Sequence, residues 1–204
     1  MTLALDRSTL DAMEKRHRAN LINSLSGYKS GNLLGSINGQ GQTNLALMSS
    51  VFHVGANPPL LGLLIRPHSV PRHSLENLME MGVFTLNVVT RDIYRQAHQT
   101  TARYARQQSE FSAVGLDEEF SALMKAPYVA QSPIKTGLSL IETQTLSVND
   151  TVLVIAEIVE LRIDEGLMTK DGQLDMNAAD AVAVTGLDEY HQASTLGRQP
   201  YPKP

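Results

Sequence analysis

The chain has 204 residues, of which 42% are hydrophobic and 19% are charged. These values are close to those of globular proteins and exclude a disordered, collagen-like or coiled-coil chain. Lys and Arg number 17 against 21 Asp and Glu, a formal net charge of -4, so no basic surface is available for a nucleic acid. The lack of cysteine excludes thiol catalysis, disulfides and cysteine-ligated metals.

No segment of the chain has the pattern of a targeting or membrane sequence. The first 20 residues are polar and charged beyond Leu5 and lack the apolar stretch of a secretory signal. No run of about 18 apolar residues occurs elsewhere. We therefore expect a cytoplasmic protein without a membrane partner.

The first predicted element is a surface helix at residues 8–20, with Asp6 or Ser8 as its N-cap. The most unusual feature follows, because the 36 consecutive positions from 30 to 65 contain no Asp, Glu, Lys or Arg. Within them, Gly39–Gln42 predicts a turn between strands at 33–37 and 45–54. After Asn57-Pro58-Pro59, the apolar run 60–65 predicts a buried strand.

The second half of the chain predicts short helices and long strands. Helices are expected at 75–81, capped by His73 or Ser74 and ended by Gly82, and at 90–104, 115–124 and 177–182. Strands are expected at 83–89, 138–146 and 151–163, the last two joined by a turn at 147–150, and the end of the chain, 198–204, is expected to be extended. There is neither an internal repeat nor a linker. We therefore predict one domain, 1–204, of the α+β class, mainly β, with a barrel-like sheet and short flanking helices.

Familiar catalytic and binding motifs are missing. Gly27–Gly31 carries its serine one position too late for a nucleophile elbow, and the glycines at 35, 39 and 41 do not form a dinucleotide fingerprint. There is no P-loop. The six histidines are scattered without His-x-x-x-His spacing, so we expect no metal site.

The uncharged segment suits a large, flat ligand that forms hydrogen bonds, and flavin is one such ligand. Asn44, the backbone of 45–48, Ser49 and Ser50 are candidates to contact its ring system. A phosphate could bind where a loop enters a helix, through charge-assisted hydrogen bonds and the helix dipole, and the candidates there are Arg66, Arg72, His73 and Ser74. The alternative interpretation makes the serines ordinary strand residues and the arginines solvated loop charges.

Several motifs in order resemble one family. They are Asn44–Ser50, Asn57–Gly62, Arg72–Leu78, Gly82–Val89, Lys125-Ala126-Pro127 with Ser132-Pro133, and Ala156–Glu160. Together they resemble the flavin reductase-like family of FMN-binding split barrels, and the resemblance covers about residues 28 to 192. Leu47-Met48 stands where the family usually has Pro-Phe, and Ser74 replaces a usual threonine.

The resemblance implies a split β-barrel homodimer that binds FMN noncovalently. It implies that Asn44 and the backbone of Ala46, Leu47, Met48 and Ser49 face the isoalloxazine, that Ser49 and Ser50 approach the phosphate, and that Arg72 and Ser74 complete the phosphate site. Tyr190 belongs to a segment that often lines the flavin face in this family. Asn87 matches a strand asparagine of the family, for which a structural hydrogen-bonding role is an equal alternative.

The function that we predict from the resemblance is an NAD(P)H-dependent flavin reductase that passes hydride from nicotinamide to flavin N5. This step needs no protein acid or base, so we name no catalytic residue. The alternatives are a flavoredoxin-like electron carrier, a non-enzymatic FMN-binding dimer, and a split barrel without flavin. The choice between NADH and NADPH, the terminal acceptor and a partner monooxygenase stay open.

Overall fold

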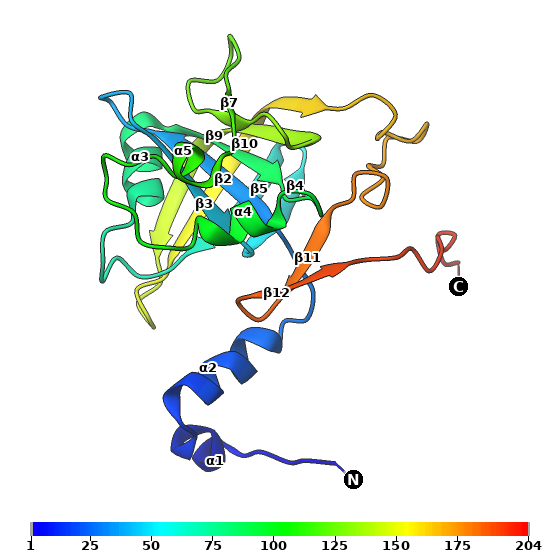
Figure 1. The fold of residues 1–204 in the computed structure, drawn as a ribbon. Helices are drawn as coiled ribbons and strands as arrows, with labels where there is room; N and C mark the ends of the chain where they lie inside the picture. The colour runs from blue at the N-terminus through cyan, green and yellow to red at the C-terminus, as the bar shows by residue number, and fades with distance from the viewer. Residues whose placement is uncertain (1, 204) are drawn as a thin grey trace.

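A seven-stranded antiparallel sheet forms the body of the protein (Figure 1). The structure, a computed structural model, describes residues 2–203. The strand order in the sheet is β3-β2-β6-β9-β10-β5-β4. The strands are β2 (Asn32–Ile37), β3 (Thr43–Met48), β4 (Val51–Ala56), β5 (Pro59–Ile65), β6 (Val83–Val88), β9 (Ile134–Thr145) and β10 (Val152–Ile163).

The two edge strands of this sheet are consecutive in the chain. Only Ser49 and Ser50 join β3 to β4, although the two strands lie at opposite edges of the sheet. Such a link spans at most about 10 Å, so the sheet must curl until its edges approach each other. β3 and β4 do not pair, and the barrel therefore stays open between them. This confirms the predicted split barrel.

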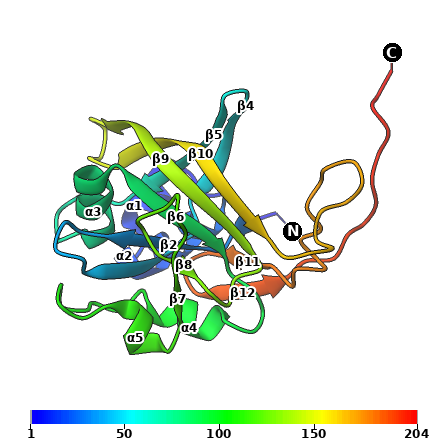
Figure 2. The ribbon, with the colours of Figure 1, turned by 90° about the horizontal axis from the view of Figure 1, so that it is seen from above.

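Two apolar clusters lie on opposite faces of the curled sheet. The inner cluster fills the barrel, and α3 (His73–Met81) contributes Leu75 and Leu78 to it. The outer cluster lies against β2 and β3, where α4 (Tyr94–Gln99) and α5 (Glu110–Val114) cover the sheet (Figure 2). Leu34 belongs to the inner cluster and Leu33 to the outer one, as the alternation of a strand requires.

Smaller elements surround the barrel. β7 (Glu118–Glu119) pairs with β8 (Tyr128–Val129), and β1 (Lys29–Ser30), β11 (Val182–Thr185) and β12 (Glu189–Gln192) form a three-stranded sheet. Asn87 connects the barrel to β8. It is fully buried, donates to the Leu33 carbonyl at 3.0 Å and accepts from the Val129 N–H at 3.0 Å. Asn87 therefore has the structural hydrogen-bonding role that the sequence analysis gave as an alternative.

The N-terminal segment extends away from the barrel as two helices, α1 (Arg7–Ala12) and α2 (Lys15–Ser24) (Figure 1). Neither helix contains a buried residue, which confirms the predicted surface position. Asp6 caps α1, as predicted, by accepting from the Thr9 N–H at 2.8 Å. The single predicted helix is wrong, because Glu14 accepts from the His17 N–H and starts a second one. No helix within 2–203 is long and apolar enough to cross a membrane.

The remaining helix and strand predictions are partly wrong. The strand predicted at 45–54 is two strands, since the chain leaves one edge of the sheet at Ser49 and enters the other after Ser50. α3 begins at His73 with Arg72 as N-cap and has no side-chain cap, so the predicted cap is wrong. Its predicted end at Gly82 is confirmed, with φ 69°.

Three further helices differ from the prediction. The helix expected at 90–104 is confined to α4, since its neighbours form turns. The helix expected at 115–124 lies earlier, as α5, because Gly115 adopts φ 71° and ends a helix instead of starting one. Residues 177–182 form turns that lead into β11 and not a helix. The predicted strands 83–89, 138–146 and 151–163 are confirmed with small shifts of their ends.

Candidate functional site

A hydrogen bond joins the uncharged strand β3 to the start of α3. Asn44 Nδ2 donates to Ser74 Oγ at 2.8 Å, and each residue is only 7% exposed. One turn further along α3, Asn77 Nδ2 donates to Ser36 Oγ on β2 at 3.1 Å. These contacts place the first turn of α3, which follows the N-cap residue Arg72, against Asn44 on β3 and Ser36 on β2. Of these two strand residues, Asn44 was a predicted candidate.

A second hydrogen bond joins the C-terminal side of β3 to the end of β5. Ser50 Oγ donates to the Leu64 carbonyl at 2.7 Å, two residues before Arg66. The two bonds, Asn44 to Ser74 and Ser50 to Leu64, connect β3 to the segment 64–74 at both ends. The stretch of β3 from Asn44 to Ser49 is about 17 Å long at 3.4 Å per residue. Segments 44–50 and 64–74 therefore lie side by side at the split of the barrel.

The outer edge of β3 is held by side chains instead of by a neighbouring strand. The Leu45 N–H donates to Glu110 Oε2 at 2.9 Å, and the Leu47 N–H donates to Thr100 Oγ1 at 3.0 Å. An edge strand otherwise leaves such groups unpaired. Because these N–H groups are engaged, backbone donors for a ligand are left to Ser49 and Ser50. Burial raises the pKa of Glu110, against the opposing effect of its backbone hydrogen bonds.

Leu47 and Met48, which replace the usual Pro-Phe, point to opposite faces. Met48 packs against the cluster inside the barrel, whereas Leu47 packs against the outer cluster beneath α4. Ala46 lies on the same face as Met48, because side chains two positions apart share a face. A ligand on one face of β3 can therefore contact the side chains of Ala46 and Met48. A ligand on the other face can contact the side chain of Leu47.

The arginines after β5 form a corner of positive charge. Arg72 Nε donates to the Pro67 carbonyl at 3.2 Å, which brings Arg72 back to the residue next to Arg66. Within residues 2–203 neither arginine forms an ion pair with a carboxylate. Burial, together with the charges of Arg66 and Arg103, lowers the pKa of Arg72. The N-terminal N–H groups of α3 have no side-chain cap and open toward the same corner.

One carboxylate lies in the first turn of α3, and its charge is already compensated. Glu76 Oε1 accepts from His68 Nε2 at 2.9 Å and from the Arg72 N–H at 3.1 Å, and Glu76 Oε2 pairs with Arg106 Nη1 at 2.5 Å. Burial acts to raise the pKa of Glu76, but the hydrogen bonds from His68 and Arg72 and the charge of Arg106 lower it on balance. Among the described residues, Arg66 and Arg72 are left without a carboxylate partner.

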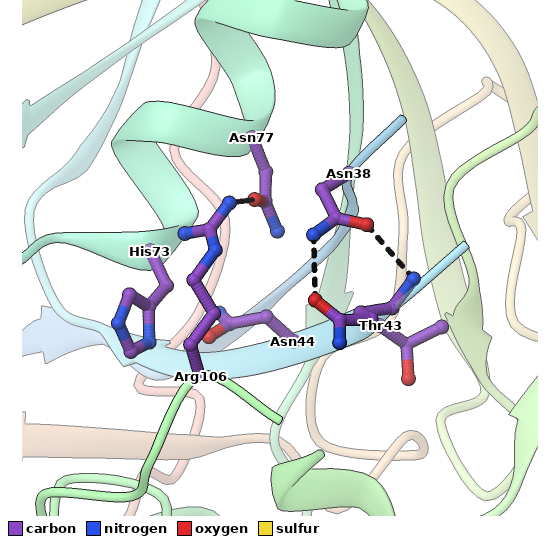
Figure 3. A pocket seen from close by; sticks show the side chains of 7 residues that line it. Asn38, Thr43, Asn44, His73, Asn77 and Arg106 are labelled. Carbon is purple, nitrogen blue, oxygen red and sulfur yellow. Dashed lines mark hydrogen bonds between the residues drawn. The ribbon is translucent and has the colours of Figure 1, made fainter. Parts of the chain in front are cut away.

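A narrow polar recess lies beside the Asn44–Ser74 pair (Figure 3). In the figure the Arg106 guanidinium lies beside His73 and bonds to Asn77 Oδ1, at 2.9 Å. The recess has a cavity volume of about 0 Å³ for a water-sized probe, against the ~300–1,000 Å³ typical of ligand pockets. It is too small for a flavin ring. Its lining residues are Asn38, Gln42, Thr43, Asn44, His73, Asn77 and Arg106.

A larger hollow of about 410 Å³ contains Tyr190. Tyr190 OH hydrogen-bonds His98 Nδ1 at 3.0 Å, and its ring lies 5.3 Å from that of Tyr94. Burial raises the pKa of Tyr190 to about 12, with a further effect of Asp188. Tyr94 begins α4, and Thr100 directly after α4 contacts Leu47, so the hollow lies about one short helix away from β3. Its lining residues are Arg91, Tyr94, Val182, Asp188, Glu189, Tyr190, His191 and Gln192.

Among the predicted candidates, the structure joins Asn44 directly to Ser74, and it joins Ser50 to Leu64 near Arg66. It also adds residues that the sequence did not indicate. Thr100, Arg106 and Glu110 reach β3 and α3 from a segment about 30 to 65 positions away along the chain. No local motif marks them. No group of three or more His, Asp or Glu side chains in the described part of the chain could hold a metal ion.

The fold defines a split-barrel protein with two arginines, Arg66 and Arg72, near the start of α3, and comparison identifies the family. Residues 25–177 match the family model described as flavin reductase like domain. The match covers well over half of the chain, which therefore belongs to the flavin reductase-like family. The resemblance noted in the sequence is confirmed.

Solved structures agree with this assignment. A candidate flavin reductase with split barrel domain from Shewanella frigidimarina NCIMB 400 is 47% identical, with a TM-score of 0.96 over 98% of this chain and 100% of that chain. Nitrilotriacetate monooxygenase component B from Bacillus cereus is 18% identical, with a TM-score of 0.86 over 98% and 99%. Flavoredoxin of Desulfovibrio vulgaris (Miyazaki F) is 21% identical, with a TM-score of 0.75 over 86% and 92%.

Proposed function

We propose that this protein binds FMN noncovalently between segments 44–50 and 64–74 and acts in the cytoplasm as an NAD(P)H-dependent flavin reductase. The observation that carries the proposal is Arg72, a partly buried cation without a carboxylate partner at the uncapped start of α3. A phosphate monoester supplies the missing negative charge. Family membership supports flavin as the class of ligand.

Different residues of segments 44–50 and 64–74 would contact the different chemical groups of FMN. Arg72, the N–H groups of His73 and Ser74, and the Ser74 hydroxyl, which only accepts from Asn44, would hold the phosphate. Arg66 adds charge from the end of β5. Ser49 and Ser50 would meet the polar part of the ligand at the split, and Ala46 and Met48 would provide its apolar contact. Bound FMN supplies a ring that takes hydride from nicotinamide and passes electrons on.

The chain itself contributes binding and orientation. β3 is held rigidly at its outer edge by Glu110 and Thr100, so Ser49 and Ser50 are fixed at the end of a clamped strand. The uncharged strand places no carboxylate beside the ligand, which favours a ring that accumulates negative charge when it is reduced. Hydride transfer between nicotinamide and flavin needs no protein acid or base, so no side chain is assigned a proton transfer.

A homodimer is part of the proposal. Phe52, Val54 and Leu64 are 42%, 43% and 38% exposed, and all three lie on the outer face of β4 and β5. Leu153 and Ile155 of β10 extend this apolar face. β4 is moreover an edge strand with unpaired backbone groups. A second copy of the chain would cover both features, and the recess beside Asn44 is too small to enclose a flavin.

We infer that reduced flavin passes to a separate monooxygenase. The likeness to nitrilotriacetate monooxygenase component B extends over nearly the whole of both chains, whereas the flavoredoxin match covers 86% of this chain. These neighbours share the fold. Experiment must decide whether the protein supplies reduced flavin to a monooxygenase or only carries electrons on its bound FMN.

The proposal is tested by reconstituting the purified protein with FMN and adding NADH or NADPH without oxygen. We expect one bound FMN per chain and bleaching of the flavin absorbance by one of the two nicotinamides. Bound FMN that is bleached only by dithionite would favour the electron carrier. Protein that does not bind FMN would contradict the proposal.

A further inference from the structure

The N-terminal arm, residues 2–28, projects from the barrel without packing into it. The arm comprises α1 and α2 and extends below the barrel in Figure 1. Neither helix contains a buried residue. With 6 and 10 residues, both are shorter than the ~12–15 residues that an isolated helix needs to be even marginally stable in water. The arm therefore needs a packing surface that its own barrel does not supply.

The C-terminal end of the arm is held in place. Lys29 Nζ donates to the Asn23 carbonyl at 3.0 Å and to the Gly186 carbonyl at 3.1 Å, which ties the end of α2 to the turn between β11 and β12. The Tyr28 ring lies 4.8 Å from the ring of His191 on β12. These contacts fix the direction in which the arm leaves the barrel and leave both helices uncovered.

One side of α2 is an apolar stripe that consists of Leu21, Ile22 and Leu25. These residues have the spacing of a single helix face. Ile22 is 47% exposed and Leu25 is 70% exposed. An apolar stripe of this kind is normally covered in a folded protein.

The arm also differs in charge from the rest of the chain. It has four of the 17 Lys and Arg residues but only three of the 21 Asp and Glu residues, so the net negative charge lies in the remainder. Asp6 and Glu14 cap the two helices, and Asp11 pairs with Arg7. The basic run 15–18 is left without a carboxylate partner among the described residues. Its charge favours contact with the acidic remainder of a chain.

The outer face of β4, β5 and β10 has the complementary properties, and we call it the β4–β5–β10 face. Phe52, Val54 and Leu64 are exposed on it, and Ile155 extends it. Glu157 lies on the same face, because it is two positions from Ile155 along β10. The face is thus apolar with a carboxylate beside it, as the stripe of α2 is apolar with a basic run beside it. Contiguous exposed apolar patches mark interaction sites.

We propose that the arm of one protomer packs on the β4–β5–β10 face of a second copy of the chain, with the stripe of α2 on the apolar centre and the basic run toward Glu157. In a twofold dimer this contact occurs twice, once in each direction. The inference rests on the homodimer of the proposed function and extends it, because it assigns the segment that covers the face. Both helices of the arm precede residue 25, where the match to the family model begins.

Crosslinking tests the contact directly, because the chain has no cysteine of its own. Leu25→Cys protein is mixed with Val54→Cys protein, and a short bismaleimide is added after the subunits have exchanged. In the control mixture Val148→Cys replaces Val54→Cys, since Val148 is 85% exposed in the turn between β9 and β10. We expect the Val54→Cys mixture to form crosslinked two-chain species about 100-fold faster than the control, because effective concentrations within a complex reach the mM range.

A charge in the stripe gives a second readout. We expect Ile22→Glu to raise the dissociation constant of the dimer at least about 10-fold, because an uncompensated charge is costly to bury in an interface. Asn20→Glu is the matched control, since Asn20 is exposed on the other side of α2, and it should dissociate like the wild type. Sedimentation over a dilution series measures the constants, and melting curves establish that each variant folds.

Equal crosslinking rates in the two mixtures, or equal dissociation constants for Ile22→Glu and Asn20→Glu, would overturn the inference while the homodimer stands. A monomeric wild type would contradict the homodimer as well, and FMN binding would still be measured separately. A monomer that sediments with phosphatidylserine vesicles, and loses this binding in Ile22→Glu, would assign the arm to a lipid surface and overturn the inference.

Discussion

Asn44 and Ser74 are 30 residues apart in the chain and share a buried hydrogen bond of 2.8 Å. This bond fixes the N-terminal end of β3 against the first turn of α3. It leaves the Ser74 hydroxyl hydrogen free to donate to a further acceptor, because Ser74 is the acceptor of the Asn44 amide. The pair therefore serves the fold and the candidate phosphate site together.

A double-mutant cycle on this pair tests its structural part. We expect Asn44→Ala and Ser74→Ala each to lower the free energy of unfolding of the apoprotein by about 1–3 kcal/mol, since each leaves a buried polar group unpaired. The double variant should lose about 0.5–1.5 kcal/mol less than the sum. Urea unfolding measures all three values, and strictly additive losses would show that the two side chains do not interact.

Much of the fold could be predicted from local patterns, because the ends of helices depend on residues within a few positions of one another. Gly82 ends α3 in the left-handed conformation, and Asp6 caps α1, both as the residue types indicate. The break at Ser49-Ser50 could not be predicted, because it follows from closure of the sheet and not from the preferences of two serines. Long β10 was predictable because half of its 12 residues are β-branched.

The candidate site was predictable only where it consists of neighbouring residues. Ser49, Ser50 and Arg72 stand in motifs of the family, and the structure brings their segments together. Glu110 and Thr100 support β3 from another part of the chain, and their position depends on how α4 and α5 pack on the barrel. A single sequence has no pattern that pairs Glu110 with the Leu45 N–H.

The buried carboxylate of Glu110 predicts a pH dependence of stability. Burial raises its pKa above the ordinary 4.5, so in the unfolded chain Glu110 ionises at lower pH than in the folded protein. The stability that it contributes is complete below about pH 4.5 and is lost as the pH rises through its folded-state pKa. We expect Glu110→Gln, which keeps an acceptor for the Leu45 N–H, to remove this loss.

Free energies of unfolding measured in urea between pH 4.5 and 8 check this prediction. The difference between Glu110→Gln and wild type should shift in favour of the variant as the pH rises. Glu142→Gln is the control, because Glu142 is exposed on β9, and it should follow the wild type. A difference between Glu110→Gln and wild type that stays constant with pH would contradict the assignment.

The apolar outer face of β4 predicts the effect of a charge on assembly. We expect Phe52→Glu to convert a homodimer into monomers, because an unpaired carboxylate in a dry interface is costly to bury. Light scattering after size exclusion measures the mass. Val148→Glu is the control, since Val148 is 85% exposed in the turn between β9 and β10, away from this face. A dimeric Phe52→Glu protein would show that the dimer uses another surface, and a monomeric wild type would contradict the proposed dimer.

The most direct test of the central claim is the ratio of the riboflavin to the FMN dissociation constant, which reports contact with the phosphate alone. We expect wild-type protein to prefer FMN, and Arg72→Ala combined with Ser74→Ala to weaken FMN about 100-fold or more while riboflavin changes little, since the lost contacts are charge-assisted. Equal weakening of FMN and riboflavin would contradict a phosphate site at the start of α3.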